Sequence, residues 1–122
     1  MQFIDMHCDS LMTLLFRDRE GAGLYDSKVT SVDFLRMKAG GQLAQFFAVF
    51  LPPQEGYRMM GVEPMADEAY IAALRQCLLD NVAAHEDLIR MAYSAQDIER
   101  NRAAGRMSAV LTMEDGRAVE GR

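Results

Sequence analysis

Residues 3–11 read FIDMHCDSL, a stretch with the composition of a buried strand that nevertheless carries an acid or a histidine at every second position from Asp5. Side chains along a strand point alternately to the two faces of a sheet. One face is predicted to hold Phe3 and the charged groups of Asp5, His7 and Asp9. The other face is predicted to hold only the apolar residues Ile4, Met6 and Cys8. The charged face is suited to hold something of opposite charge.

The composition is that of a globular domain. Half of the 122 residues are hydrophobic, which is enough for a buried core. The net charge of −5 comes from acids spread along the chain, and there is no basic block of the kind that binds phosphate backbones. Nucleic acid is therefore not expected as a partner.

The sequence gives no sign of a membrane or secretory segment. The longest apolar run, LAQFFAVFL at 43–51, has about half the length that a membrane-spanning helix needs. The first sixteen residues lack a positive leading region, which argues against a signal peptide. We expect no transmembrane segment and a cytoplasmic location, where Cys8 and Cys77 are reduced thiols.

Apolar runs and helix signals predict alternating strands and helices. The predicted strands are residues 2–7, 43–51 and 107–113. The predicted helices are Ser10 to Arg17 with Ser10 as cap, a short helix capped near Ser31 and stopped by Gly40, a long helix from Pro64 to about Ala92, and a short one capped by Ser94. Residues 54–63 are expected to form a loop.

This order predicts an α/β fold with a parallel sheet, because long crossovers join short, nearly all-apolar strands. In such folds the chemistry lies at the carboxyl ends of the strands. His7 ends the first predicted strand and Asp9 comes just after it, and Glu114 follows the last one. The two clusters are therefore expected at the same edge of the sheet.

His7 and Asp9 have the spacing of two ligands to one metal ion. Zinc binds histidine nitrogen and carboxylate oxygen, and Glu114 can reach the same ion or bridge two ions. The plainer alternatives stay open: His7 and Asp9 can simply hydrogen-bond at an exposed strand end, and Glu114 can be a solvated acid before a glycine turn.

Three blocks of the sequence, FIDMHCDSL, GGQLAQFFAVF and AVLTMEDGRAV, resemble in their order and separation the amino-terminal part of the membrane (renal) dipeptidase family. These are zinc peptidases with an amidohydrolase-like TIM-type barrel, and the resemblance covers nearly the whole chain. It implies that residues 1–122 are a single partial (β/α) barrel domain, with the first three strands and their helices.

The resemblance also implies roles for individual residues. His7 and Asp9 correspond to ligands of one zinc ion, and Glu114 to a ligand that bridges two. A hydroxide held between the zinc ions would attack the carbonyl of a dipeptide, and the complete enzyme is a possible homodimer. The family commonly has Glu-Gly-Gly where this chain has Glu114-Asp115-Gly116, so the backbone there is expected to differ.

In the family, two further histidines and an aspartate come from later strands, and a full barrel takes about 250 residues. We therefore expect this chain to be an amino-terminal fragment that is inactive alone. Of the remaining candidates, His85 is expected to be structural and Cys8 a core residue. Asp5 is expected either to support His7 or to pair with another group deeper in the barrel. Tyr57 and Arg58 are expected in a solvated loop, with contact to a substrate carboxylate as the alternative.

Two competing interpretations remain. One is a different metal-dependent hydrolase of the same barrel type, acting on cyclic amides or phosphoesters; its first strand would more usually read His-x-His, whereas this one has Asp9 in the second position. The other is a non-catalytic remnant that pairs with a partner chain. Zinc uptake that is lost in His7→Ala separates a working site from a remnant.

Overall fold

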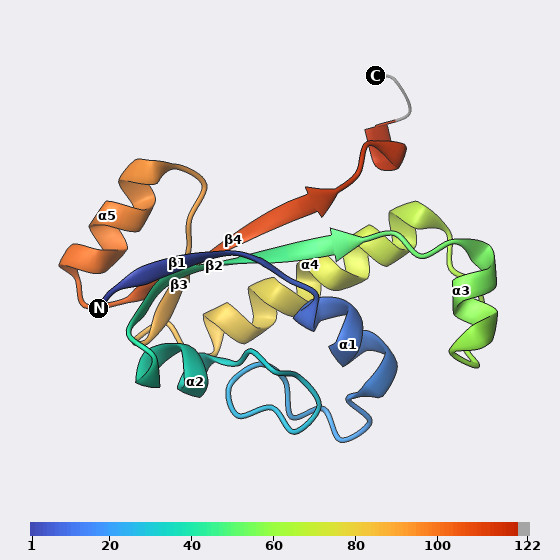
Figure 1. Cartoon of the computed structure of the whole chain (residues 1–122), viewed down its shortest axis with the longest axis horizontal. Coiled ribbons are helices and arrows are strands. Elements are labelled where there is room, and N and C mark those ends of the chain that lie inside the picture. Colours follow the sequence, from blue (N-terminus) through green and yellow to red (C-terminus); the bar gives the residue numbers. More distant parts are fainter. Residues whose placement is uncertain (120–122) are drawn as a thin grey trace.

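A computed structural model describes residues 1–119 as one layered α/β unit (Figure 1). Its elements in chain order are β1 (Phe3–Cys8), α1 (Ser10–Arg17), α2 (Phe34–Ala39), β2 (Gln42–Phe50), α3 (Gln54–Met59), α4 (Asp67–Ala83), β3 (Ile89–Met91), α5 (Ala95–Ala103), β4 (Met107–Glu114) and the 3-10 helix η1 (Arg117–Val119). The predicted α/β class is confirmed.

The strands form one parallel sheet in the order β1-β2-β4-β3. β2 and β4 pair along nearly their whole length, from Ala44 opposite Ser108 to Phe50 opposite Glu114. β3 was not predicted as a strand, and it pairs only with the first residues of β4, from Met107 to Ala109. The carboxyl ends of β1, β2 and β4 therefore point to one side, as the sequence predicted.

Helices cover the two faces of the sheet unequally. The main core lies on the face that α1 and α4 cover, where Ala109 of β4 joins buried residues such as Leu11 and Leu74. On the other face α5 lies over the amino ends of the strands, and its Asn101 donates a buried hydrogen bond to the hydroxyl of Ser108. Figure 1 shows α4 and α5 on opposite sides of the strands. The carboxyl ends of the strands are thus left clear of α5.

The segment between β2 and β4 differs most from the prediction. Residues 54–59 form α3, where a loop was expected, and Tyr57 is fully buried there. The long helix ends at Ala83 instead of Ala92, because a turn in which Leu88 and Ile89 donate to the carbonyl of His85 redirects the chain into β3. Ile89 continues the helical spacing by chance, and pairing with β4 decides its conformation.

Two of the three predicted helix caps are displaced by one or two residues. α1 begins at Ser10 with Asp9 in the cap position, and α2 begins after Asp33, whose carboxylate accepts the backbone N–H of Arg36 at 2.8 Å. The third cap is confirmed, because the hydroxyl of Ser94 accepts the N–H of Asp97 at 3.1 Å.

β1 is less regular than the predicted alternation. Its register with β2 shifts twice, and between Asp5 and Cys8 it contains one residue more than the facing stretch from Gln45 to Phe47. Such a bulge re-aims the side chains that follow it. The regular alternation predicted for Asp5 and His7 is therefore interrupted by the bulge.

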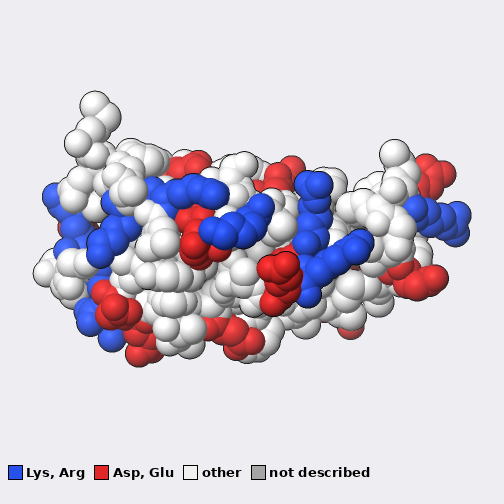
Figure 2. All heavy atoms as spheres, turned by 90° about the horizontal axis from the view of Figure 1, so that it is seen from below, with Lys and Arg blue, Asp and Glu red and all other residues white. Residues whose placement is uncertain are grey.

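None of the helices in residues 1–119 is long and apolar enough to cross a bilayer. On the face shown in Figure 2, Lys and Arg side chains are interspersed with Asp and Glu. The surface seen there has the mixed charge of an ordinary globular domain.

Candidate metal centre

The ends of β1 and β4 bring together His7, Asp9 and Glu114. Each offers one ligand atom, and these atoms lie within 4.8 Å of one another. The Nε2 atom of His7 is 3.3 Å from Oδ1 of Asp9 and 3.5 Å from Oε2 of Glu114. Within residues 1–119 no other group of three histidine, cysteine, aspartate or glutamate side chains meets this criterion.

Asp9 reaches this cluster because its carboxylate is not used for capping. It occupies the cap position of α1, and its backbone carbonyl accepts the N–H of Thr13 at 3.2 Å. Aspartate in this position usually accepts a backbone N–H of the first turn with its side chain, but here it makes no such bond. The start of α1 thus fixes the backbone of Asp9 and leaves its carboxylate to face His7.

Glu114 is the last residue of β4 and pairs with Phe50 at the end of β2. The next residue, Asp115, has a φ of 67°, a left-handed conformation that glycine adopts most easily. Its carboxylate accepts the N–H of Arg117 at 2.7 Å, which helps to hold the turn. Arg117 in turn forms an ion pair with Asp67 at 3.0 Å. The turn after Glu114 is thereby tied to the start of α4.

Asp5 supports the cluster differently from the prediction. Its carboxylate accepts the backbone N–H of His7 at 3.1 Å, so it braces the bulged backbone of β1 and not the imidazole. Cys8 lies in the main core, as predicted. Burial, with the nearby charges of Asp5 and Asp9, raises the pKa of the Cys8 thiol, so that it is neutral at neutral pH.

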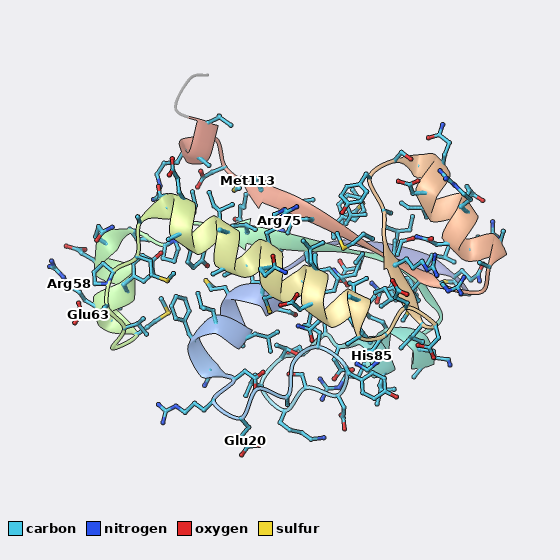
Figure 3. The ribbon with its side chains drawn as sticks, turned by 180° about the vertical axis from the view of Figure 1, so that it is seen from behind. Glu20, Arg58, Glu63, Arg75, His85 and Met113 are labelled. Atoms are coloured by element: carbon cyan, nitrogen blue, oxygen red, sulfur yellow. The ribbon has the colours of Figure 1, made fainter. Side chains whose placement is uncertain are left out.

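His85 and Arg58 lie away from the cluster. The ring of His85 stacks on that of Tyr25 at 4.2 Å between centroids, which agrees with the structural role expected for it. Figure 3 shows His85 at the far end of α4 from Met113, which lies next to Glu114 in β4. The same view shows Arg58 on α3, pointing away from the molecule.

The donor set fits a metal ion. Imidazole nitrogen and carboxylate oxygens are ligands that zinc accepts. The side chains of His7, Asp9 and Glu114 are between 43% and 51% exposed, so an ion can reach them from solvent. Oδ1 of Asp9 is nevertheless buried and has no hydrogen-bond partner, despite its closeness to His7. A cation held by His7 and Asp9 would satisfy that oxygen.

Sequence reasoning missed a pair of buried tyrosines that pack between α1, α3 and α4. Tyr57 and Tyr70 are fully buried next to Phe16 of α1, and neither hydroxyl has a hydrogen-bond partner. The available signal for Tyr70 was its place in the stripe that continues through Leu74 and Leu78 of α4. That stripe predicts that Tyr70 is buried, but not that its ring packs on Phe16.

A strand-end cluster of this kind on a parallel α/β sheet is typical of metal-dependent hydrolases. The chain belongs to the membrane dipeptidase family (peptidase family M19), whose sequence profile matches residues 1–122. It is 28% identical over 99 residues to Dipeptidase ataJ from Aspergillus terreus, an alignment that covers 76% of this chain and 23% of that protein.

Solved structures agree with this assignment. A metallo peptidase from Rhodobacter sphaeroides, liganded with a phosphinate mimic of the dipeptide L-Ala-D-Ala, is 25% identical, with a TM-score of 0.74 over 93% of this chain and 38% of that chain. The dipeptidase AC, also of family M19, is 27% identical, with a TM-score of 0.72 over 94% of this chain and 37% of that chain.

A third structure, the probable dipeptidase PvdM from Pseudomonas aeruginosa, shares the fold at 18% identity, with a TM-score of 0.61. This chain spans under two fifths of the length of each of these relatives. The family and the Aspergillus terreus relative are described as dipeptidases, and the first two of these solved structures are described as metallo peptidases.

Proposed function

We propose that this chain supplies the first metal ligands of a zinc-dependent dipeptidase: His7 and Asp9 from the end of β1 and Glu114 from the end of β4. The observation that carries the proposal is the convergence of their ligand atoms within 4.8 Å at the carboxyl edge of a parallel sheet. The likeness to a metallo peptidase solved with a mimic of L-Ala-D-Ala supports a dipeptide as the substrate class.

Each residue has a distinct part in this proposal. His7 offers an imidazole nitrogen, for which Asp5 fixes the backbone. Asp9 offers a carboxylate whose backbone the start of α1 holds, and Glu114 offers one from a turn anchored through Arg117 to Asp67. When bound, zinc polarises a carbonyl and lowers the pKa of water at the site.

The proposal extends to the two zinc ions and the homodimer of a complete enzyme, and to the cytoplasmic location expected from the sequence. These stay predictions. We propose that the chain alone holds a metal site but hydrolyses no appreciable amount of dipeptide. In the family that the sequence resembles, further residues of the site come from later strands. Hydrolysis of dipeptides such as L-Ala-D-Ala by the purified chain would contradict that part.

Metal binding by variants tests the assignment of ligands. Asp9→Asn and Glu114→Gln keep the size of each side chain and remove a charged ligand oxygen, and we expect each to weaken zinc binding by tenfold or more. Asp26→Asn, an exposed acid beside Lys28, is the matched control and should bind as the unmodified chain does. Competition with a chromogenic chelator measures the affinity.

The outcomes separate the remaining interpretations. Equal zinc binding by Asp9→Asn, Glu114→Gln and Asp26→Asn would show that the acids of the cluster are not ligands. An unmodified chain that binds no zinc would favour the non-catalytic remnant, since the relatives that carry the family's activity are more than twice as long.

A further inference from the structure

Two cavities adjoin each other along one side of α1. The larger, of about 560 Å³, lies between α1 and the turn after α3, and Phe16 and Met60 are among its apolar lining residues. The smaller, of about 300 Å³, lies between Asp9 and the loop that precedes α2. Thr13 and Arg17 line both cavities. The space that begins at the candidate metal ligand Asp9 therefore continues toward Arg17.

Asp9, Thr13 and Arg17 form one row on α1, because residues four apart lie on the same side of a helix. The hydroxyl of Thr13 donates to the backbone carbonyl of Asp9 at 3.3 Å, so it is turned onto the helix backbone. Arg17 is the last residue of the helix, about 12 Å along its axis from Asp9. Side chains on a helix lean toward its amino end, which agrees with the place of Arg17 in the wall of a cavity that Asp9 also lines.

The guanidinium of Arg17 has no carboxylate partner within residues 1–119. None of the ion pairs in this part of the chain involves Arg17 or Arg19. The acid between them, Asp18, is turned to the following loop, where its carboxylate accepts the N–H groups of Ala22 and Gly23 at 3.1 and 2.8 Å. Arg19 also lines the larger cavity, whose lining contains no acid. That cavity therefore carries positive charge in a protein whose net charge is −5.

A carboxylate on a short apolar stem complements this surface. Guanidinium groups bind carboxylates through paired, charge-assisted hydrogen bonds. The apolar side chains of Phe16 and Met60 suit the methylene groups that carry the carboxylate of a glutamate residue. A dipeptide held by its backbone at the candidate metal centre would have its side chains free to extend along α1.

We propose that Arg17, with Arg19 beside it, is a specificity-determining residue that binds the carboxylate of an acidic side chain in the dipeptide substrate. This inference rests on the proposed function, because it assumes that a dipeptide is held at His7, Asp9 and Glu114. It adds to that function a preference for dipeptides with an acidic residue over their neutral counterparts.

The test measures the binding of dipeptides to the zinc-loaded 122-residue chain by NMR titration, which does not depend on hydrolysis. L-Ala-D-Glu is compared with L-Ala-D-Gln, and L-Glu-D-Ala with L-Gln-D-Ala, because each pair differs only in a side-chain carboxylate or carboxamide. In at least one pair we expect the acidic dipeptide to bind about fivefold more tightly, as an exposed ion pair allows. The preference should decrease as salt is added, since salt screens exposed charges.

Arg17→Gln removes the positive charge and keeps a polar side chain. We expect the preference to fall to within about twofold. Zinc affinity should not fall in this variant, because the charge that is removed repels the cation. Arg58→Gln is the matched control: Arg58 is exposed and points away from the molecule in Figure 3, so its loss should leave the preference unchanged.

The outcomes separate this inference from the proposed function. An unmodified chain that binds no zinc contradicts both. A chain that binds zinc but no dipeptide, or that binds the two members of each pair equally, contradicts only the role of Arg17. A preference that survives in Arg17→Gln contradicts that role as well, and so does one that falls equally in Arg58→Gln, because net charge would then explain it.

Discussion

Asp9 serves two parts of the structure at once. Its backbone carbonyl begins the hydrogen bonding of α1 by accepting the N–H of Thr13, while its carboxylate turns to His7 instead of capping the helix. A capping bond would contribute about 1 kcal/mol to stability, so its omission is a small cost to the fold. Such a cost is expected where a side chain is kept for function.

Asp115 provides a test of backbone strain next to Glu114. Its φ of 67° disfavours any residue with a Cβ, and its carboxylate bond to Arg117 offsets part of that cost. Both Asp115→Ala and Asp115→Gly lose the bond, but only glycine relieves the strain. We expect Asp115→Gly to unfold at higher denaturant concentration than Asp115→Ala, with a difference of about 1 kcal/mol in the free energy of unfolding.

Equal stability of the two Asp115 variants would show that the turn relaxes to another conformation. The comparison also bears on the family pattern, because the strained position is the one where the family commonly has glycine.

The cluster of His7, Asp9 and Glu114 was predictable because each residue is tied to the end of an apolar strand. The burial of Tyr57 and the surroundings of Tyr70 were not. Gly56 and the two methionines after Arg58 made residues 54–59 resemble a loop, so α3 was not predicted. No local sequence pattern shows that a residue of α4 packs on Phe16 of α1. Contacts between elements distant in sequence have no periodic signal.

At the scale of the elements, the loop that follows Asp18 makes hydrogen bonds that hold α1 and α4 together. Asn81 of α4 accepts the N–H of Leu24 at 2.7 Å, and Asp18 accepts that of Gly23 at 2.8 Å. Gly23 has a φ of 71°, and a Cβ built on it would lie 2.3 Å from Oδ1 of Asn81. The loop therefore needs glycine for two reasons, its conformation and its contact with α4.

Gly21 supplies the control for Gly23. Its φ is 69°, but a Cβ built on it would meet nothing within 4 Å. Gly21→Ala should therefore lose about 1 kcal/mol of unfolding free energy from backbone strain alone. Gly23→Ala should lose about 1 kcal/mol more, because the Asn81 hydrogen bond is displaced. Denaturant unfolding measures both, and equal losses would show that Asn81 shifts freely.

Elements with a strong local signal were predicted nearly to the residue, as with β2 between the glycines at 40–41 and Pro52. β3 was not predicted because three residues are too few to show the alternating hydrophobic pattern of a strand. Pairing with β4 makes them a strand. Helix ends without a glycine or proline nearby, such as that of α4 at Ala83, were also misplaced.

At the scale of the whole molecule, the described sheet is open at β1. Within residues 1–119 this strand pairs only with β2, and its Phe3, Ile4 and Met6 are between 42% and 65% exposed. An apolar edge strand is a template for pairing with another chain. The sheet thus favours association at this edge.

We predict that the isolated chain self-associates through β1. Met6→Lys should reduce the association, because a charged side chain on an edge strand opposes pairing. Met59→Lys is the control, since Met59 is 88% exposed but belongs to α3. Light scattering over a range of protein concentrations measures the effect. A monomeric unmodified chain, or equal effects of the two substitutions, would contradict the prediction.

The most direct test of the metal site is an anomalous-difference map at the zinc absorption edge from crystals of the chain grown with zinc. The account predicts one strong peak between His7, Asp9 and Glu114, with ligand distances of about 2.0–2.2 Å. The absence of a peak there at saturating zinc, or a peak only at other side chains such as His85 or Cys77, would contradict it.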